Sequence, residues 1–134
     1  MKIYKVRVIN PGRVRGELLL SRTPISFYGG VDPDTGRIME EGHELNGEFI
    51  KGKIFAFPRG KGSTVGSYVI LRLARRGLGP LGIINFEAEP IIAVGAIISG
   101  IPLVDKIDGS FFGENRSGSM IELDGYRGLV KVLE

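Results

Sequence analysis

Apolar and polar residues alternate along the first part of the chain with the two-residue period of a β-strand. The alternation covers residues 3–8, and a Pro-Gly turn separates it from a second run at residues 13–20. Because successive strand side chains point to opposite faces, each run can turn one face toward a core. Further strands are predicted for residues 24–28 and 53–57, and a loop for the turn-forming residues 32–36.

The pattern then changes to a helical period. Val65, Val69 and Leu73 are spaced by four residues, so they share one face of a helix predicted over residues 64–76. Two arginines occupy its last turn, and Gly77 follows in the position of a helix C-cap.

Buried strands and a second helix follow in alternation. Residues 81–86 and 101–104 are apolar runs of strand length, and between them Pro90 opens a helix that is predicted to end near Ser99. The last segment, residues 119–133, predicts a hairpin with a glycine-containing turn.

This order of elements predicts a single α/β domain that spans residues 1–134. A β-rich layer is followed by β-α-β-α-β, with neither an internal repeat nor a linker. A chain of 134 residues with 43% hydrophobic residues is long enough to bury a substantial core. Its 21 glycines follow no repeat period, so they indicate turns and close backbone approaches.

Composition narrows the classes of function. The sequence has no cysteine and one histidine, so no thiol chemistry and no metal site are expected on this chain. Net charge is +3, but basic residues occur only in pairs, which favours a small anionic ligand over nucleic acid. The most apolar stretch, residues 90–104, is shorter than the roughly 20 residues of a membrane span. With no signal-peptide pattern at the N-terminus, we expect a cytoplasmic protein.

Candidate chemistry concentrates in a glycine-rich stretch, residues 60–67, between a predicted strand and a predicted helix. Glycines let backbone N–H groups approach a ligand, and the N-terminus of the following helix favours negative charge. Lys61 adds a cation, while Ser63 and Thr64 add hydroxyls. The stretch therefore predicts an anion-binding loop with Lys61, Gly62 and Thr64 as ligand contacts.

Two nucleotide-binding motifs do not fit this loop. A P-loop needs Ser or Thr directly after Gly-Lys, where this chain has Gly62, and the dinucleotide fingerprint needs Gly where Val65 stands. From the residues alone, Ser63 has two interpretations that stay open. It is a helix N-cap, which is the commoner role, or an anion-binding hydroxyl, and one serine can serve both.

Two motifs resemble the small subunits of the aconitase X family. The first is Pro-Ile-Ser-Phe-Tyr-Gly-Gly-Val-Asp-Pro-Asp-Thr-Gly-Arg-Ile at residues 24–38, and the second is Gly-Ser-Thr-Val-Gly-Ser-Tyr-Val at residues 62–69. Residues 42–47 and 87–100 fit the same family, so the resemblance covers nearly the whole chain. Residues 108–118 have no counterpart that we identify.

The resemblance implies a fold, a partner and a reaction. The fold would be a swivelling β/β/α domain like the C-terminal domain of aconitases. The partner would be a large subunit whose cysteines hold a 4Fe–4S cluster, with no cofactor bound by this chain alone. The activity would be that of a hydro-lyase (dehydratase). Archaeal members of the family convert (R)-5-phosphomevalonate to trans-anhydromevalonate 5-phosphate in the mevalonate pathway, and bacterial relatives dehydrate cis-3-hydroxy-L-proline.

The resemblance also implies roles for particular residues. The serine of the Gly-Ser-Thr motif, Ser63 here, would accept the proton from the substrate α-carbon. Serine is a poor base unless its alkoxide is stabilised, which the helix N-terminus, Lys61 and cations of the large subunit would provide. Gly29 and Gly30 are expected to line the substrate site. A non-catalytic interaction module on the same fold is the alternative function.

Polar residues of the 32–43 region are interpreted structurally. His43 lies among polar residues and glycines without further candidate ligands, so we expect a loop or packing role. Asp32 and Asp34 resemble the start of a calcium loop, but the downstream pattern fails, so we expect turn-forming carboxylates.

Two further charged pairs have simple expected roles. Arg13 and Arg15 alternate along a strand and point to one face, where solvation is expected and an anion or partner carboxylate is the alternative. Glu87 and Glu89 precede the second helix, where their charge complements the helix dipole.

Overall fold

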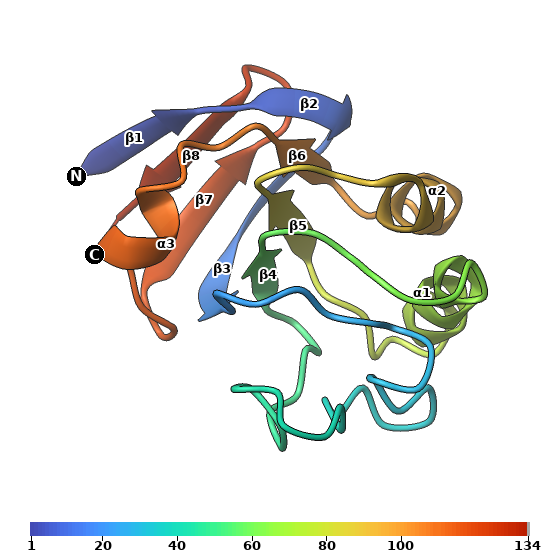
Figure 1. Cartoon of the computed structure of the whole chain (residues 1–134). Coiled ribbons are helices and arrows are strands. Elements are labelled where there is room, and N and C mark those ends of the chain that lie inside the picture. The colour runs from blue at the N-terminus through green and yellow to red at the C-terminus, as the bar shows by residue number, and fades with distance from the viewer. Residues whose placement is uncertain (134) are drawn as a thin grey trace.

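The computed structural model contains one mixed eight-stranded sheet with helices packed beside it (Figure 1). The structure describes residues 1–133. The elements in chain order are β1 Lys2–Lys5, β2 Arg7–Asn10, β3 Arg13–Leu20, β4 Ile54–Phe57, α1 Gly66–Arg75, β5 Gly82–Asn85, α2 Pro90–Ser99, β6 Leu103–Asp105, α3 Phe111–Glu114, β7 Met120–Asp124 and β8 Leu129–Val132.

The sheet closes on itself in the manner of a barrel. Its strand order is β1-β8-β7-β3-β4-β5-β6-β2, so the first two strands of the chain lie at opposite ends of the order. These strands are separated only by Val6, whose N–H donates to the carbonyl of Gly128 at 3.0 Å. The single strand predicted over residues 3–8 is therefore two strands, because the chain changes its pairing partner at Val6.

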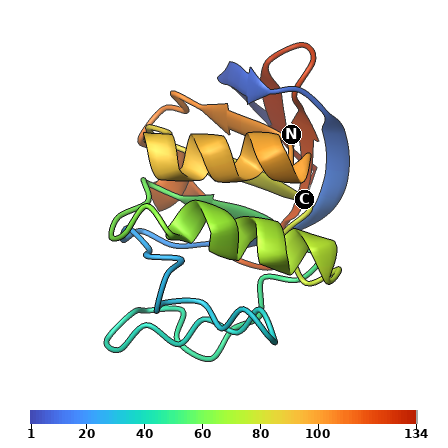
Figure 2. The same cartoon turned by 90° about the vertical axis from the view of Figure 1, so that its right-hand side faces the viewer.

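The predicted β-α-β-α-β order is confirmed in the helix-bearing half of the sheet. Strands β3, β4, β5 and β6 are parallel neighbours, and α1 and α2 make the connections from β4 to β5 and from β5 to β6. The two helices lie side by side over one face of the sheet (Figure 2). They approach closely at Gly95, where a Cβ would be 2.6 Å from Ile70 Cδ1. The predicted C-terminal hairpin is β7–β8.

Alternation along the central strands divides the core into two clusters. Leu19 and Phe55 belong to the cluster beneath the helices, whereas Leu18, Leu20 and Ile54 belong to a second cluster on the opposite face of the sheet. Each of these side chains is almost fully buried. Burial of a large apolar side chain contributes about 1.5–3 kcal/mol to folding, so the two-residue period of β3 and β4 stabilises both layers at once.

The strand predicted over residues 24–28 is wrong. Residues 21–53, here called the 21–53 loop, carry only isolated β-bridges, among them Ile25 to Gly60. Ile25 and Phe27 have side chains buried under the helix layer, and the backbone pairing of this segment is limited to the single bridge of Ile25. An apolar run of five residues signals burial, and burial alone does not specify a strand.

Candidate functional site

Three loops leave the sheet at the carboxyl ends of neighbouring parallel strands. Because β3, β4 and β5 are parallel neighbours, the segments that follow their carboxyl ends start side by side. These segments are the 21–53 loop, the glycine-rich loop at residues 58–65 and the connection at residues 86–89. In parallel α/β folds, both open sheets and barrels, ligand sites lie at the carboxyl ends of the strands. The topology therefore puts the glycine-rich loop with Ser63 where such sites form.

Ser63 lies exposed in the turn before α1. Its Oγ accepts a hydrogen bond from the N–H of Val65 at 3.1 Å, and its carbonyl accepts from the N–H of Gly66 at 3.0 Å. The N-cap position of α1 is Val65, which makes no side-chain cap. Ser63 therefore stabilises the turn that leads into the helix instead of capping the helix itself, and its hydroxyl already receives one backbone donor.

The predicted ligand residues Gly29 and Thr64 line different hollows of the surface. Gly29 lines a hollow of about 270 Å³ together with Val65 and Tyr68. Thr64 lines another hollow, of about 350 Å³, between α1 and the start of α2. Gly30, unlike Gly29, is buried. Gly29 and Thr64 thus line two different hollows that share Tyr68 of α1, not one cavity.

Lys61 is paired with a carboxylate that the sequence analysis did not single out. Its Nζ lies 2.8 Å from Glu40 Oε2, and its backbone N–H donates to the carbonyl of Ile25 at 3.1 Å. Partial burial acts to raise the pKa of Glu40, but the bonds from Lys61 and the Ser26 amide outweigh it and lower that pKa below its ordinary value. Lys61 is therefore a held cation at the base of the Ser63 loop.

Ser26 is enclosed by two glycines of the predicted site. A Cβ on Gly62 would overlap Ser26 Oγ, and a Cβ on Gly30 would overlap the carbonyl oxygen of Ser26. Gly62 also has a φ of +88°, in the left-handed region that favours glycine. The Ser26 hydroxyl donates to the carbonyl of Tyr28 at 2.8 Å. Gly62 thus lets the Ser63 loop approach the 21–53 loop directly, and Gly30 lets the 21–53 loop fold closely on itself.

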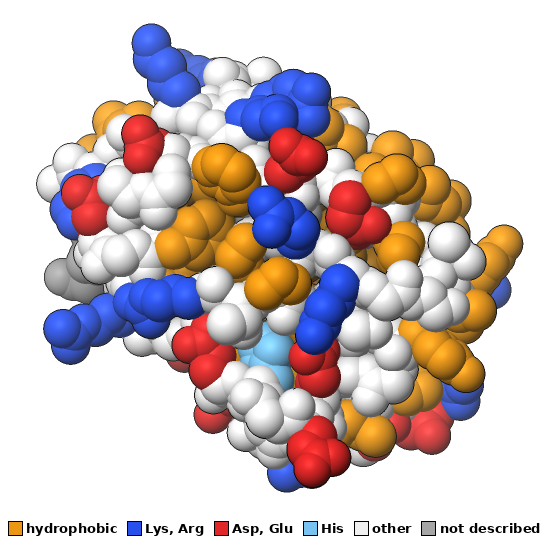
Figure 3. All heavy atoms as spheres, viewed as in Figure 1, with side chains coloured by type: hydrophobic (Ala, Val, Ile, Leu, Met, Phe, Trp, Pro, Cys, Tyr) orange, Lys and Arg blue, Asp and Glu red, His pale blue; other side chains and the backbone are white. Residues whose placement is uncertain are grey.

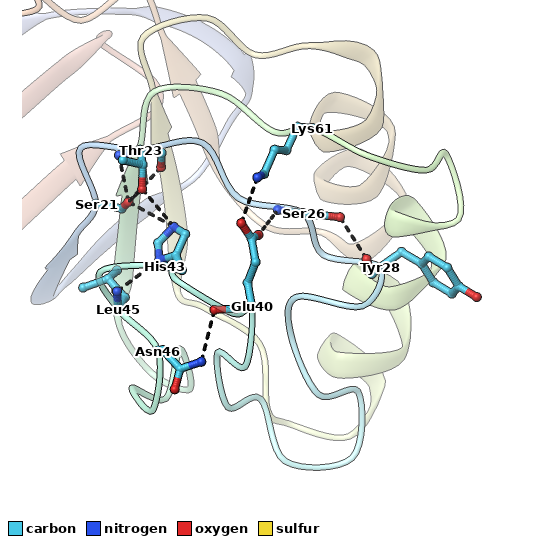
Figure 4. A network of polar contacts seen from close by, with 9 residues as sticks. All are labelled: Ser21, Thr23, Ser26, Tyr28, Glu40, His43, Leu45, Asn46 and Lys61. Carbon is cyan, nitrogen blue, oxygen red and sulfur yellow. Dashed lines mark hydrogen bonds and ion pairs between the residues drawn. The ribbon is translucent and has the colours of Figure 1, made fainter.

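His43 has a structural role consistent with the sequence analysis. The side chain is buried; its Nδ1 accepts from the N–H of Leu45 at 3.0 Å, and its Nε2 lies 3.2 Å from Thr23 Oγ1 (Figure 4). Because Nδ1 is an acceptor, the proton of the neutral ring is assigned to Nε2, which donates to the hydroxyls of Thr23 and Ser21. The ring fixes the base of the 21–53 loop.

The other charged residues singled out from the sequence are used locally. Asp32 accepts from the N–H of Asp34 at 2.9 Å, as expected of a turn-forming carboxylate. The Asp34 carboxylate in turn pairs with two arginines of the α1 region. Arg13 and Arg15 are exposed, and each donates to Glu122 at 3.0 Å. The arginines are thus satisfied by a carboxylate of this same chain.

Three further features of the chain concern its surface charge, its possible metal ligands and the length of its helices. Figure 3 shows acidic and basic side chains interspersed on the viewed face, without a continuous basic stripe. Within residues 1–133, no group of three or more His, Cys, Asp and Glu side chains is arranged to hold a metal ion. None of the helices in that range has both the length and the apolar character that crossing a bilayer requires.

Comparison with known proteins gives consistent matches over almost the entire chain. The family model described as aconitase X swivel domain matches residues 3–132. A curated relative from Pyrococcus furiosus, named phosphomevalonate dehydratase small subunit, is 57% identical over 129 residues, which are 96% of this chain and 94% of the relative. A relative of the same name from Methanosarcina acetivorans is 51% identical over 130 residues, covering 97% of this chain and 90% of the relative.

A solved structure agrees with these matches. The crystal structure of Thermococcus kodakaraensis aconitase X in its holo form includes a chain that superposes on this one with a TM-score of 0.95. The two chains are 46% identical, and the superposition covers 100% of each. The α/β swivelling fold expected from the sequence motifs is thereby confirmed.

Proposed function

Because the chain belongs to the aconitase X swivel-domain family, we propose that it is the small subunit of a hydro-lyase, phosphomevalonate dehydratase. Curated relatives of that name are similar to this chain over nearly its full length, which supports the assignment. The activity would then belong to a complex with a large subunit. Residues 1–134 would move as one swivelling unit, because both core clusters draw on strands from the two halves of the sequence.

The proposed reaction converts (R)-5-phosphomevalonate to trans-anhydromevalonate 5-phosphate. A base removes the proton from the α-carbon, and the electron pair of the broken C–H bond forms the new double bond. The C–O bond at the β-carbon breaks, and the hydroxyl leaves as water after it gains a proton. Such a reaction requires one group that accepts the α-proton and another that assists the leaving oxygen.

We assign the role of base to Ser63. The observation that carries this proposal is its exposed Oγ, which lies directly before α1 and accepts the Val65 N–H at 3.1 Å. A backbone donor and the positive end of the helix dipole both stabilise an alkoxide relative to the hydroxyl, which lowers the pKa of a serine in that position. Lys61, two positions before Ser63, is the cation of the same loop, and its Nζ is paired with the Glu40 carboxylate.

The remaining substrate contacts are assigned to the same loop and its neighbour. Gly62 and Thr64 are exposed residues, and backbone N–H groups and a hydroxyl at such positions are suited to the carboxylate and to the negative charge that develops beside it. Gly29 is the exposed member of the Gly29–Gly30 pair, so it is the one proposed to face substrate, while Gly30 supports Ser26 from below.

This chain does not fit an iron–sulfur cluster. The sequence has no cysteine, and the described residues contain no alternative ligand group. The 4Fe–4S cluster that the aconitase relationship implies is therefore assigned to the large subunit. The contribution of this chain is limited to proton removal at the α-carbon and to contacts with the anionic groups of the substrate.

The test is turnover of (R)-5-phosphomevalonate by the chain co-expressed anaerobically with a candidate large subunit. The wild-type complex is expected to release water, and the Ser63→Ala complex to lose about 10²–10⁴-fold in kcat, the usual contribution of a general base. Ser110→Ala is the control, because Ser110 is also an exposed serine and lies before α3. Size-exclusion chromatography of each complex reports whether assembly is intact.

Each alternative result changes a different part of the proposal. Near-normal turnover of the Ser63→Ala complex removes Ser63 from the role of base. Turnover of cis-3-hydroxy-L-proline in place of phosphomevalonate keeps the hydro-lyase and changes the substrate. A complex that has its cluster but acts on neither compound indicates a non-catalytic interaction module on the same fold.

A further inference from the structure

Glu40 connects three segments of the chain at the candidate site. Its Oε1 accepts the N–H of Ser26 at 2.9 Å, and its Oε2 lies 2.8 Å from Lys61 Nζ (Figure 4). Ser26 and Glu40 belong to different parts of the 21–53 loop, and Lys61 belongs to the loop that carries Ser63. One carboxylate therefore bridges the long loop and the proposed catalytic loop.

The backbone of Glu40 is anchored independently of its side chain. Its carbonyl accepts from the N–H of His43 and from Asn46 Nδ2, each at 3.1 Å, and its own N–H donates to the carbonyl of Gly30 at 3.1 Å. His43 is itself buried and hydrogen-bonded. The Glu40 carboxylate thus starts from a fixed backbone position, whereas the Lys61 side chain is 51% exposed and has a flexible stem.

Contacts on either side of Lys61 transmit this position to Ser63. The Lys61 N–H donates to the carbonyl of Ile25 at 3.1 Å, and Gly62 packs directly against the Ser26 side chain. Ser63 is the next residue. A change in the place of Lys61 is therefore expected to shift the turn that presents the Ser63 hydroxyl, because the one residue between them, Gly62, is held against Ser26.

The energetics favour a positioning role over a stabilising one. A partly exposed ion pair contributes at most about 1 kcal/mol to folding, so the Glu40–Lys61 pair is a weak source of stability. In contrast, displacing a reacting group by about 1 Å costs roughly 10²-fold in rate. The lowered pKa of the Glu40 carboxyl keeps it charged, and able to hold Lys61, at neutral pH.

We propose that Glu40 is a positioning residue: it holds Lys61, and through Lys61 the loop that presents Ser63, in the orientation that the reaction needs. This inference rests on the proposed function of Ser63 and deepens it. Glu40 acts through Lys61 and contacts no reacting atom. The 21–53 loop, which adds little regular structure to the fold, thereby gains a role as the support of the catalytic loop.

The test compares Glu40→Gln, Lys61→Met and the double variant in the co-expressed complex. Glu40→Gln keeps an oxygen for the Ser26 N–H and removes the charge that holds Lys61. It is expected to lower kcat about 10- to 100-fold with a smaller change in KM, because the alignment of the base matters in the transition state. In the Lys61→Met background the same change is expected to cost less than about twofold, since its partner is already gone.

Glu44→Gln is the matched control. Glu44 is another carboxylate of the 21–53 loop with a lowered pKa, and it accepts from the N–H of Arg22 and from Ser21 Oγ. It makes no contact with the Ser63 loop among its hydrogen bonds in the described residues. Its variant is expected to stay within about twofold of wild type in kcat, because only the carboxylate that holds Lys61 positions the loop.

Hydrogen–deuterium exchange of the same complexes separates this inference from the proposed function. Glu40→Gln is expected to speed exchange in residues 60–65, whereas Glu44→Gln leaves that segment unchanged. If the wild-type complex has no dehydratase activity, the proposed function fails and the exchange result still tests the positioning role. Unchanged exchange in Glu40→Gln, or kinetic effects of the two variants that simply multiply, would overturn the inference.

Discussion

At the scale of single residues, Gly62 is constrained by both its backbone and its neighbour. Its φ is +88°, and a Cβ would overlap Ser26 Oγ, which is bonded to the carbonyl of Tyr28. Gly62→Ala is therefore expected to destabilise the chain by left-handed strain plus overpacking, roughly 1–3 kcal/mol beyond strain alone. Urea unfolding measures the difference in the free energy of unfolding.

Gly42→Ala measures the cost of left-handed backbone strain without overpacking. Gly42 has a φ of +76°, but nothing lies within 4 Å of the position of its Cβ, so this variant is expected to lose only about 1–2 kcal/mol. Adding Ser26→Gly to Gly62→Ala removes the overlapping hydroxyl and is expected to recover the overpacking part. Equal losses for Gly62→Ala and Gly42→Ala would mean that contact with Ser26 does not constrain the loop.

The candidate site combines a loop that has a local sequence signal with a carboxylate, Glu40, that has none. The closely spaced glycines and the helix predicted after them indicated the loop of Lys61 and Ser63, because both features can be read from neighbouring residues. Glu40 is 21 positions before Lys61 and precedes a second glutamate, Glu41, with no periodic pattern between them. Only the folded loop turns Glu40 inward and leaves Glu41 exposed, so no local rule distinguishes the two.

At the scale of elements, α2 begins with a carboxylate cap. Glu89 accepts from the N–H groups of Ile91 at 3.0 Å and Ile92 at 2.9 Å, and Pro90 occupies the first turn. Glu89→Ala is expected to lower stability by about 0.5–2 kcal/mol, because two N–H donors lose their partner. Thermal and urea unfolding of the variant measure this loss.

Glu87→Ala provides a control two residues away. Glu87 is exposed and pairs only with the exposed Lys106 among its side-chain contacts in residues 1–133, at 3.1 Å. Its removal is expected to change stability by no more than about 0.5 kcal/mol. Similar losses of stability in the two variants would mean that negative charge near the helix dipole, as expected from the sequence, explains the effect. The specific hydrogen bonds of the Glu89 cap would then make no separate contribution.

Helices and strands were predictable where the periodic pattern of apolar residues extends over enough residues to be recognised. Both long helices and the C-terminal hairpin lie where the sequence pattern placed them, although α1 starts at Gly66, two residues later than expected. Residues 108–118, for which the sequence motifs gave no counterpart, are covered by the family model. The four-residue α3 in this segment was not predicted, because it is too short for a helical period. The 24–28 strand failed because buried loop residues have the same composition as a short strand.

At the scale of the whole molecule, closure of the sheet was beyond local reasoning. β1 pairs with β8 and β2 pairs with β6, partners that lie about a hundred residues away in the sequence. Periodicity identifies strands but not their partners, so only the family motifs indicated the swivelling fold. Those same motifs suggested that Ser63 is the base, whereas the residues alone left Ser63 with two interpretations.

An ion cluster across the closed sheet makes stability depend on pH. Glu122 on β7 is buried, and it accepts from Arg15 and Arg13 of β3 at 3.0 Å each, with Lys131 of β8 at 3.8 Å. The bond from Arg15 is the main reason that the pKa of Glu122 lies below its ordinary value of 4.5, although burial opposes it. The unfolded chain therefore binds this proton first as the pH falls.

The lowered pKa of Glu122 determines how the stability of the chain changes with pH. The stabilisation by Glu122 is fully present above about pH 4.5 and is lost as the pH falls through the lowered folded-state pKa. Glu122→Gln, which resembles the protonated acid, is expected to destabilise the chain at pH 7 and to match wild type increasingly well toward acid. Urea unfolding at neutral and acid pH measures the difference.

Glu17→Gln on β3, which breaks an exposed pair with Lys53, is expected to change stability by less than about 0.5 kcal/mol at neutral pH. If Glu122→Gln lowers the free energy of unfolding equally at both pH values, the charge of Glu122 does not stabilise the contact of β3, β7 and β8. The loss would then come from how the amide packs in place of the carboxylate.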